Sequence, residues 1–268
     1  MSASSSPLAV VTGAGSGIGY ALTHALVARG FEVIAIDLDI SALTHERVRA
    51  HAIDVRDGAA MAALAEPWVA RPVQYVFANA GIGGIPGDVL SASDDAWQWA
   101  WEVNVASVLR TLRLWWPHLR AAGGKAVATL SAAALQSYPG AGPYRASKAA
   151  LLSALEGLYY ESAGSGVSVH ALCPGMVRSD IINLQRYAEA APLAASRAAA
   201  PNPFVDYIRD AMTRAEPASQ FAERVLDGLE AGAPFYWFTH PETLPWIEAR
   251  HRAIIDGRKP FTDFGMPA

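Results

Sequence analysis

Short apolar runs alternate along the chain with longer stretches of helical periodicity, and this alternation limits the possible folds more than any other feature. The runs have the length and the β-branched or apolar character of buried strands, whereas the stretches between them repeat apolar residues every three or four positions. Strands that alternate with helices form right-handed crossovers and a parallel sheet with helices on both faces. The expected strands lie at 8–12, 32–37, 51–54, 73–78, 125–130, 167–173 and 235–238, and the expected helices near 17–29, 57–70, 94–122, 144–162 and 217–230.

No internal repeat, charge run or linker interrupts this pattern. Apolar residues make up 52% of the chain and charged residues 17%, which excludes a disordered chain. We therefore expect a single α/β domain over 1–268, with a Rossmann-like doubly wound sheet of about seven parallel strands. Residues 1–6 are predicted to be a flexible tail and residues 240–268 a C-terminal extension. Residues 178–213 are too long for an ordinary connection and are predicted to form a lid over a binding site.

Charge and cysteine content exclude several classes of function. A net charge of -4 and a pI near 6.0 provide no positive surface for nucleic acid or for an anionic membrane. The single cysteine, Cys173, allows neither an internal disulfide nor a CxxC metal site, and the seven histidines have no metal-ligand spacing, so no metal is expected. The first residues lack the features of a signal peptide, and no apolar run is long enough to span a membrane. We expect a cytoplasmic protein whose partner is a small neutral molecule.

The first expected strand leads directly into the sequence TGAGSGIG, which places Gly13, Gly17 and Gly19 on the turn that opens the first helix. Glycines let the backbone approach a pyrophosphate closely, and a helix N-terminus offers it unpaired N–H groups and a positive dipole end. The spacing GxxxGxG differs from the common GxGxxG, and a glycine-rich turn also occurs without a ligand. The turn alone therefore suggests a dinucleotide without establishing it.

The second expected strand ends at Asp37, 18 residues beyond Gly19. An acid at this point accepts hydrogen bonds from the adenosine ribose and repels a 2′-phosphate, which favours NAD over NADP. Neither Ser16 nor Leu38 offers a positive charge to a further phosphate. The alternative is that Asp37 only caps the turn that follows the strand.

Tyr144 and Lys148 lie four residues apart on one face of an expected helix, in a chain with only three lysines. A cation one helical turn away favours the ionised phenol and lowers its pKa. Such a tyrosine is a usable acid or base near neutral pH. A pair of this spacing also arises by chance in a chain with nine tyrosines, so its interpretation depends on the other motifs.

Taken in order, the motifs resemble those of the classical short-chain dehydrogenase/reductase family over nearly the whole chain. TGAGSGIG matches the glycine motif, Asp37 the ribose acid and DV at 54–55 the pair that contacts adenine. ANAG at 78–81 matches the turn after the fourth strand, although the family more often has Asn in place of Ala78. PGMVRS at 174–179 resembles the segment over the nicotinamide, with Ser179 where Thr is usual. The resemblance implies NAD bound by Gly13, Ser16, Gly17, Ile18, Gly19, Asp37, Asp54, Val55, Asn79, Ala80, Gly81, Tyr144, Lys148, Pro174, Gly175, Val177 and Ser179.

The resemblance also implies a catalytic tetrad of Asn104, Ser131, Tyr144 and Lys148. Tyr144 would move the proton at the substrate oxygen while a hydride moves to or from nicotinamide. Lys148 would lower the phenol pKa and bind the nicotinamide ribose, Ser131 would hold the substrate oxygen, and Asn104 would bind a water that links Lys148 to solvent. The implied function is an NAD-dependent oxidoreductase that interconverts a secondary alcohol and a ketone. The alternatives are a dinucleotide-binding regulatory protein without catalysis and an NADP-preferring carbonyl reductase.

The residues expected around the substrate are mostly apolar or aromatic, which favours a bulky aromatic or alicyclic alcohol or ketone. Arg178 is expected to form a surface ion pair, and Arg186, Arg197, Arg209 and Arg214 to be solvated. The expected pocket residues are Met176, Ile181, Ile182, Leu184, Tyr187, Leu193, Phe204, Tyr207, Ile208 and Met212, together with Leu135, Gln136 and Tyr138 from the loop after Ser131.

Two helical regions, at 100–122 and 149–160, carry more apolar surface than one face of a sheet requires. In the resembling family these helices pair with their symmetry mates, which implies a homotetramer or homodimer. Single side chains expected in the core or in subunit contacts are Trp97, Trp99, Trp101, Trp115 and Trp116, and His170 and Cys173 are expected to be plain packing residues.

Overall fold

One parallel sheet organises the structure, a computed structural model that describes residues 6–69, 71–85, 88–136, 138–183 and 203–260, without the side chains of 203–207. Its seven strands lie in the order β3-β2-β1-β4-β5-β6-β7, and every neighbouring pair is parallel. The predicted doubly wound fold is confirmed. The strands are β1 (Leu8–Thr12), β2 (Glu32–Asp37), β3 (Val48–Ala52), β4 (Tyr75–Ala78), β5 (Lys125–Thr129), β6 (Ser168–Cys173) and β7 (Tyr236–Phe238).

The middle strands are buried because helices cover both of their faces. Every residue of β1 is buried, and Val10 pairs in register with Ile34 of β2 on one side and with Val76 of β4 on the other. The chain thus leaves β1 toward one edge of the sheet and later returns to its opposite side at β4. A strand order that reverses at one point opens a crevice beyond the carboxyl ends of the strands there.

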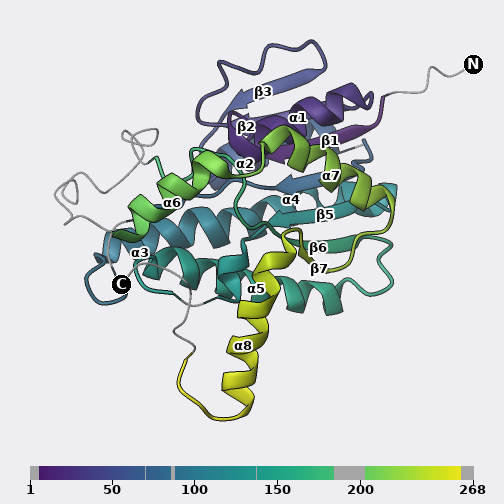
Figure 1. Cartoon of the computed structure of the whole chain (residues 1–268). Coiled ribbons are helices and arrows are strands. Elements are labelled where there is room, and N and C mark those ends of the chain that lie inside the picture. Colours follow the sequence, from purple (N-terminus) through teal and green to yellow (C-terminus); the bar gives the residue numbers. More distant parts are fainter. Residues whose placement is uncertain (1–5, 70, 86–87, 137, 184–202, 261–268) are drawn as a thin grey trace, which may run out of the picture.

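Two helical layers enclose the sheet (Figure 1). α1 (Gly17–Ala28) and α7 (Ala218–Glu230) cover one face, and their buried side chains form one core with Val11, Val127 and Leu172. The other face carries the larger core, which includes Val10 and Ile36. The helices of this second layer are α2 (Gly58–Ala65), α3 (Asp94–Trp101), α4 (Ser107–Ala122) and α5 (Gly142–Glu161).

Most boundaries lie within two residues of the predicted ones, and three regions differ more. The predicted helix at 94–122 is α3 and α4 joined by a π-helical turn, Glu102–Ala106. The predicted helix at 57–70 ends as α2 at Ala65 and continues as a 3₁₀ turn, Glu66–Trp68, because Pro67 cannot donate a helical hydrogen bond. β3 begins at Val48 rather than at residue 51, since polar side chains at the sheet edge hide its period from the sequence.

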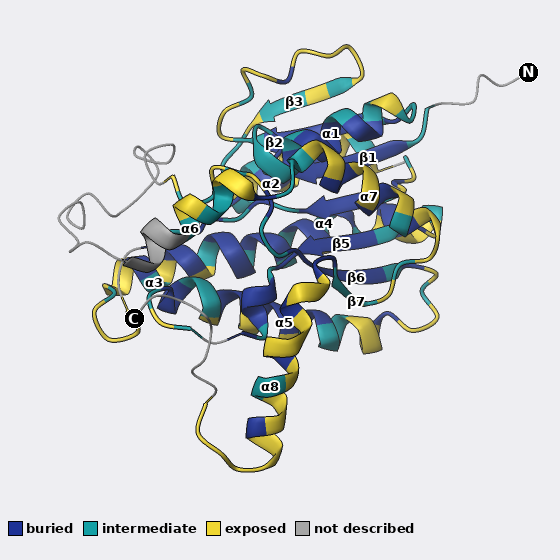
Figure 2. Ribbon diagram, viewed as in Figure 1, coloured by how far each residue is buried: buried dark blue, intermediate teal, exposed yellow. Residues whose placement is uncertain are grey.

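The C-terminal part of the chain adds α6 (Pro203–Arg214), a 3₁₀ turn (Pro241–Thr243) and α8 (Leu244–Ile255). The predicted extension at 240–268 therefore includes a helix, and α8 extends away from the two helical layers with an exposed surface over most of its length (Figure 2). Residues 1–5 of the predicted tail and residues 261–268 lie outside the described residues. Among the described helices, none has the length and apolar character needed to cross a membrane.

Candidate active site

A cleft of about 220 Å³ lies beyond the carboxyl ends of the central strands, at the point where the strand order reverses. Most of the predicted cofactor residues line it. Gly19 does not, and neither does Asn104 of the predicted tetrad. The predicted residues that line the cleft are Gly13, Ser16, Gly17, Ile18, Asp37, Asp54, Val55, Asn79, Ala80, Gly81, Ser131, Tyr144, Lys148, Pro174, Gly175, Val177 and Ser179.

The glycine turn fits a close approach of the backbone to a ligand. Gly13 and Gly17 have φ values of 67° and 52°, in the left-handed region that side chains rarely adopt. A Cβ at Gly19 would lie 2.0 Å from the Gly13 carbonyl oxygen, so only glycine allows α1 to pack this close to β1. The Ser16 side chain makes no capping hydrogen bond at the start of α1. The first turn of α1 therefore presents N–H groups and a positive dipole end to an anion in the cleft.

Gly15 also stands within TGAGSGIG, and the sequence reasoning did not single it out, although the structure leaves no room for a side chain there. A Cβ there would lie 2.1 Å from the Asp39 carbonyl oxygen. Its N–H donates to Asp37 Oδ2 at 2.8 Å, and Asp37 Oδ1 accepts a longer bond of 3.2 Å from the Asp39 N–H. Asp37 thus orders the loops on either side of it and also lines the cleft, so its two predicted roles are compatible.

Arg56 is another cleft residue that the sequence reasoning missed. Its guanidinium donates to both carboxylate oxygens of Asp54, with Nη2 2.7 Å from Oδ2. Burial raises the pKa of Asp54, but the hydrogen bonds from Arg56 outweigh burial and hold the pKa below its usual value. Asp54, which the resemblance places at the adenine, is therefore paired with Arg56, and both members of this ion pair line the cleft.

Asn79 joins the ends of three strands. Its Nδ2 donates to the Thr12 carbonyl at 3.1 Å, its Oδ1 accepts from the Thr129 hydroxyl at 3.0 Å, and its N–H donates to the Thr12 hydroxyl at 3.0 Å. β1, β4 and β5 are thereby fixed where they form the floor of the cleft. These hydrogen bonds of Asn79 hold the predicted turn after the fourth strand in place.

Ser131, Tyr144 and Lys148 come together on the wall of the cleft. Tyr144 and Lys148 lie in the first two turns of α5, and the Lys148 Nζ stands 5.9 Å from the centre of the Tyr144 ring. The lysine side chain is only 2% exposed, and its Nζ donates to the Thr129 carbonyl at 2.9 Å. Ser131 follows β5, and its hydroxyl accepts the Ala133 N–H at 3.1 Å and forms a hydrogen bond with Tyr144.

The ionisation of this pair differs from the prediction. Burial raises the pKa of Tyr144 and outweighs the opposing effect of the Ser131 hydrogen bond. Burial also lowers the pKa of Lys148 to about 8. The prediction that Lys148 lowers the pKa of this phenol fails for the protein alone, because the ammonium is oriented toward the Thr129 carbonyl and removal from water dominates. At neutral pH the protein therefore holds a protonated phenol beside a protonated amine.

Asn104 lies behind this wall, in the π-helical turn, and is fully buried. Its Oδ1 accepts the Ile82 N–H at 2.9 Å, and its Nδ2 donates to the Ile82 carbonyl and to the Ser147 hydroxyl, both at 3.0 Å. A Cβ added to Gly81 would lie 3.3 Å from both Asn104 Oδ1 and Lys148 Nζ, so the two side chains face the same glycine. The structure therefore brings the fourth predicted residue next to Lys148 without placing it in the cleft. π turns of this kind are frequent at functional sites.

The far side of the cleft is apolar, as the sequence indicates, but the residues that line it differ in part from the predicted ones. Gln136 is not in it, because its Nε2 donates to the Thr243 carbonyl at 3.2 Å, and Leu135 packs against the core. Leu184, Tyr187, Leu193 and the side chains of Phe204 and Tyr207 lie outside the described residues. The predicted residues that line the cleft are Met176, Ile181, Ile182, Ile208, Met212 and Tyr138, and those not predicted include Ile82, Ile85, Trp99 and Val103.

The remaining side chains singled out in the sequence differ in how far they are buried. His170 and Cys173 are buried in β6, as expected of packing residues. Trp99 and Trp115 are buried, whereas Trp101 is 53% exposed. Among the described residues Arg178 makes no ion pair, and its Nη2 donates to the Thr213 carbonyl at 3.4 Å, so the predicted surface ion pair stays a prediction.

Comparison with known proteins agrees with this geometry. The family model for short chain dehydrogenases matches residues 7–190, which include the glycine turn, the cleft floor and the Ser131–Tyr144–Lys148 wall. The chain belongs to the short-chain dehydrogenase family. Members of this family bind a nicotinamide dinucleotide, and the glycine cradle and the uncapped first turn of α1 fit such a group.

Two curated relatives and one solved structure illustrate the similarity. A 2-(R)-hydroxypropyl-CoM dehydrogenase from Xanthobacter autotrophicus is 34% identical over 65% of this chain and 76% of its own length. A galactitol 2-dehydrogenase (L-tagatose-forming) from Cereibacter sphaeroides is 35% identical over 65% of this chain and 72% of its own. A short-chain dehydrogenase/reductase from Burkholderia phymatum, solved with NAD, superposes with a TM-score of 0.84 at 30% identity and covers 97% of this chain and 98% of its own. These relatives support an oxidoreductase.

Proposed function

We propose that this short-chain dehydrogenase interconverts a secondary alcohol and a ketone with NAD, and that Tyr144 is its general acid and base. The observation that carries the proposal is the convergence of Ser131, Tyr144 and Lys148 on the wall of the cleft that the glycine turn also lines. A protein that only sensed a dinucleotide would need the glycine turn but would not need this wall. The test is NADH formation from a panel of secondary alcohols, with NADP assayed beside NAD.

Bound NAD supplies the hydride acceptor or donor, and the protein supplies the proton and the orientation. In the direction of ketone reduction, the protonated Tyr144 donates its hydroxyl proton to the substrate oxygen as negative charge develops there. Its raised pKa suits this direction at neutral pH. In the direction of alcohol oxidation, Tyr144 accepts the proton, which a nearby positive charge favours. In the protein alone the Ser131 hydroxyl donates to Tyr144, and with substrate bound its single hydrogen would turn to the substrate oxygen and orient it.

Lys148 contributes charge and position. With a pKa of about 8 its amine is mostly protonated at pH 7, and the Thr129 carbonyl fixes its direction. In the protein alone burial outweighs this charge, but with oxidised NAD bound the ammonium and the nicotinamide ring would together favour the ionised Tyr144 that accepts the substrate proton. Asn104 supports this arrangement by joining Ile82 to Ser147, one residue before the lysine. A water bound near Asn104 and Gly81 would link the lysine to solvent, as the sequence suggests.

NAD is the proposed cofactor because of Asp37. Its carboxylate lines the cleft, and its hydrogen bonds to Gly15 and Asp39 hold it in place. There it would accept hydrogen bonds from ribose hydroxyls and repel a 2′-phosphate. Arg56 is the cleft residue whose positive charge would favour the 2′-phosphate of NADP, but its guanidinium is paired with Asp54. Equal or better use of NADP in paired titrations would overturn this assignment.

The substrate is proposed to be bulky and largely apolar, either aromatic or alicyclic. The side chains of Ile85, Trp99, Tyr138, Ile182 and Met212 support this, since apolar and aromatic surface dominates the far side of the cleft. Residues 178–213 would form the lid, and α6 at its end places Ile208 and Met212 on the cleft. Efficient turnover of a small polyol or hydroxy acid, with little activity on aryl or cyclic alcohols, would contradict this substrate class.

Assembly into a homotetramer or homodimer is also proposed. Tyr159 and Tyr160 at the end of α5 are 49% and 77% exposed, and Tyr236 of β7 is 49% exposed, so large apolar side chains remain uncovered in the single chain. A stable monomer in light scattering at micromolar concentration would refute this. A cytoplasmic location remains a prediction from the sequence.

A further inference from the structure

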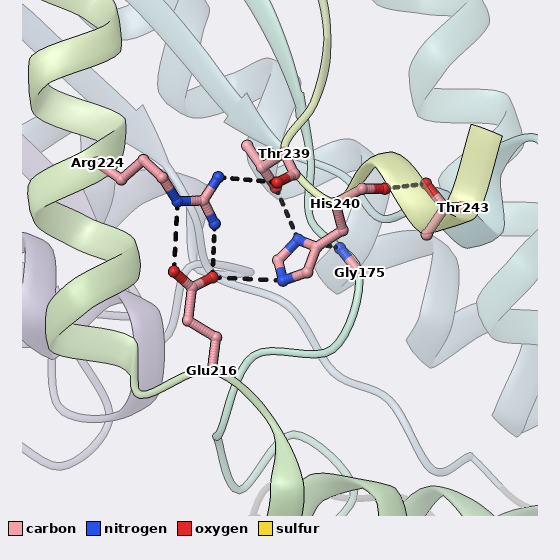
Figure 3. A network of polar contacts seen from close by, with 6 residues as sticks. All are labelled: Gly175, Glu216, Arg224, Thr239, His240 and Thr243. Atoms are coloured by element: carbon pink, nitrogen blue, oxygen red, sulfur yellow. Dashed lines mark hydrogen bonds and ion pairs between the residues drawn. The ribbon is translucent and has the colours of Figure 1, made fainter.

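One wall of the cleft depends on a histidine far away in the sequence. The segment 174–179 carries the cleft residues Gly175 and Val177, and the Gly175 N–H donates to His240 Nδ1 at 3.0 Å. A Cβ on Gly175 would lie only 2.8 Å from the His240 ring, so the imidazole packs directly against this backbone (Figure 3). His240 is 8% exposed and does not itself line the cleft. It therefore acts on the cleft through the segment.

The hydrogen-bond partners of His240 determine which ring nitrogen carries the hydrogen in the neutral form. A backbone N–H can only donate, so Nδ1 must be the acceptor, and the Thr239 hydroxyl at 3.0 Å is then a second donor to the same nitrogen. In the neutral ring the hydrogen is on Nε2, which lies 3.3 Å from Glu216 Oε2. Protonation would put a second N–H at Nδ1, facing the Gly175 N–H. The hydrogen bond to the cleft segment therefore requires a neutral His240.

Glu216 holds the segment at a second point. Its carbonyl accepts the Arg178 N–H at 2.8 Å, and the same residue forms a parallel bridge with Val177. Its carboxylate receives two hydrogen bonds from Arg224 of α7, and Arg224 also donates to the Thr239 carbonyl at 2.8 Å. Figure 3 shows the carboxylate between the guanidinium and the imidazole. One ionised cluster thus supports both ends of the segment.

The same histidine is also tied to the loop that follows Ser131. The His240 carbonyl accepts both the N–H and the hydroxyl of Thr243, at 3.0 and 2.7 Å. The Thr243 carbonyl in turn accepts from Gln136, in the loop that follows Ser131. His240 is therefore the point at which the 174–179 segment and the Ser131 loop are held by one element.

We propose that His240 is a positioning residue, whose neutral imidazole holds the 174–179 segment in its dinucleotide-binding position and releases it on protonation. This inference rests on the proposed function in that the ligand is NAD. If His240 has this role, the affinity for the cofactor depends on pH in the acidic range, and this dependence is separate from any that comes from the ionisation of Tyr144 and Lys148.

The charged groups around His240 determine the direction of the effect. Burial lowers the pKa of His240 and Arg224 adds to this effect, while Glu242, Glu216 and a backbone hydrogen bond with Met176 oppose it without outweighing it. Because the pKa of folded His240 lies below the usual value of about 6.5, the ring is neutral above that pH and takes up its proton only on the acid side of it. Cofactor affinity should therefore be constant above about pH 6.5 and fall as the pH is lowered below that value.

The experiment measures NAD binding by calorimetry from pH 8 to pH 5 for the whole protein and three variants. His240→Asn places an amide oxygen near the position of Nδ1 and does not titrate, whereas His240→Leu removes the acceptor. His251→Asn is the matched control, because among the described residues the His251 ring of α8 bonds to the Ile247 carbonyl of its own helix and to no other group. Thermal unfolding of each protein identifies any pH at which a variant is no longer folded.

We expect the wild type and His251→Asn to lose about five- to tenfold in affinity toward pH 5, the equivalent of one hydrogen bond. His240→Asn should bind within about twofold of the wild type at pH 8 and stay constant, and His240→Leu should be about five- to tenfold weaker at every pH. A wild-type affinity that does not change with pH, or an acidic loss that persists in His240→Asn, would overturn the proposal.

Hydrogen exchange of peptides that contain Gly175 separates this inference from the proposed function. After correction for the chemical exchange rate, the Gly175 amide should exchange faster toward pH 5 in the wild type but not in His240→Asn. If that pattern is seen in a protein that fails to bind NAD, His240 positions the segment and the proposed cofactor is wrong. If NAD binds and the exchange does not depend on His240, the positioning role is wrong.

Discussion

Replacement of Asn104 by alanine should destabilise the protein strongly, although Asn104 does not line the cleft. The side chain is fully buried, and its amide makes hydrogen bonds to the Ile82 N–H, the Ile82 carbonyl and the Ser147 hydroxyl, at 2.9, 3.0 and 3.0 Å. Each such bond contributes about 1 kcal/mol net, and the partners left without one carry a further desolvation cost. Asn104→Ala should therefore lower the free energy of unfolding by about 3 kcal/mol.

Thermal and urea unfolding at one protein concentration measure this loss. For a chain of this size about 3 kcal/mol corresponds to a fall in Tm of about 6 to 12 °C. Gln98→Ala is the matched control, because Gln98 has the same amide group on the preceding helix but is exposed, and within the described part of the chain its side chain bonds to Glu102 alone. The control should change stability by less than about 0.5 kcal/mol. A loss below about 1 kcal/mol in Asn104→Ala would refute the view that its amide supports the wall behind Lys148.

Three further predictions concern the cofactor, the lysine and the glycine turn. Asp37→Ser should improve the ratio of NADP to NAD use by about tenfold or more, measured as kcat/KM for both cofactors, since it removes the acceptor and the repulsion. The stability of the wild type should rise relative to that of Lys148→Met between about pH 8 and pH 10.5, measured as the difference in Tm. The reason is that Lys148 in the folded protein is neutral above its pKa of about 8, while the lysine of the unfolded chain stays charged up to pH 10.5. Below pH 8 the lysine is charged in both the folded and the unfolded protein, so the difference in Tm should be constant. Gly15→Ala should lower cofactor affinity in a binding titration, because its Cβ would meet the Asp39 carbonyl at 2.1 Å and displace the loop beside Asp37.

Much of the fold follows from local pattern. Strands such as β1 and β2 are continuous apolar runs because both faces of a parallel sheet are covered, and runs of this kind stand out in a sequence. The edge strand β3 was harder to place, since Arg49 and His51 interrupt its apolar pattern. The π turn within 94–122 has no sequence signal, because its residues continue the helical periodicity on either side.

The candidate site was predictable where function depends on a short motif. The glycine turn, Tyr144 and Lys148 are such cases, and the cleft brings them together. Contacts between distant segments were not predictable, and the pairing of Gly175 with His240 across 65 residues is the clearest example. The direction of Gln136 is another, since nothing local indicates that its amide bonds to Thr243 instead of lining the cleft.

The raised pKa of Tyr144 shows why spacing alone could not give the ionisation state. The sequence places a cation one helical turn from the phenol, but the depth of burial is a property of the folded chain. Burial acts on the two groups in opposite directions, raising the pKa of Tyr144 and lowering that of Lys148.

The most direct test of the central claim compares the wild type with Tyr144→Phe, using NAD and a panel of bulky secondary alcohols. We expect NADH formation by the wild type and a loss of about 10²- to 10⁴-fold in kcat for the phenylalanine variant, with NAD affinity within about twofold of the wild type. Most of the activity retained in Tyr144→Phe would contradict the role of Tyr144 as the acid and base. NAD binding by the wild type with no turnover of any alcohol or ketone would contradict the oxidoreductase itself.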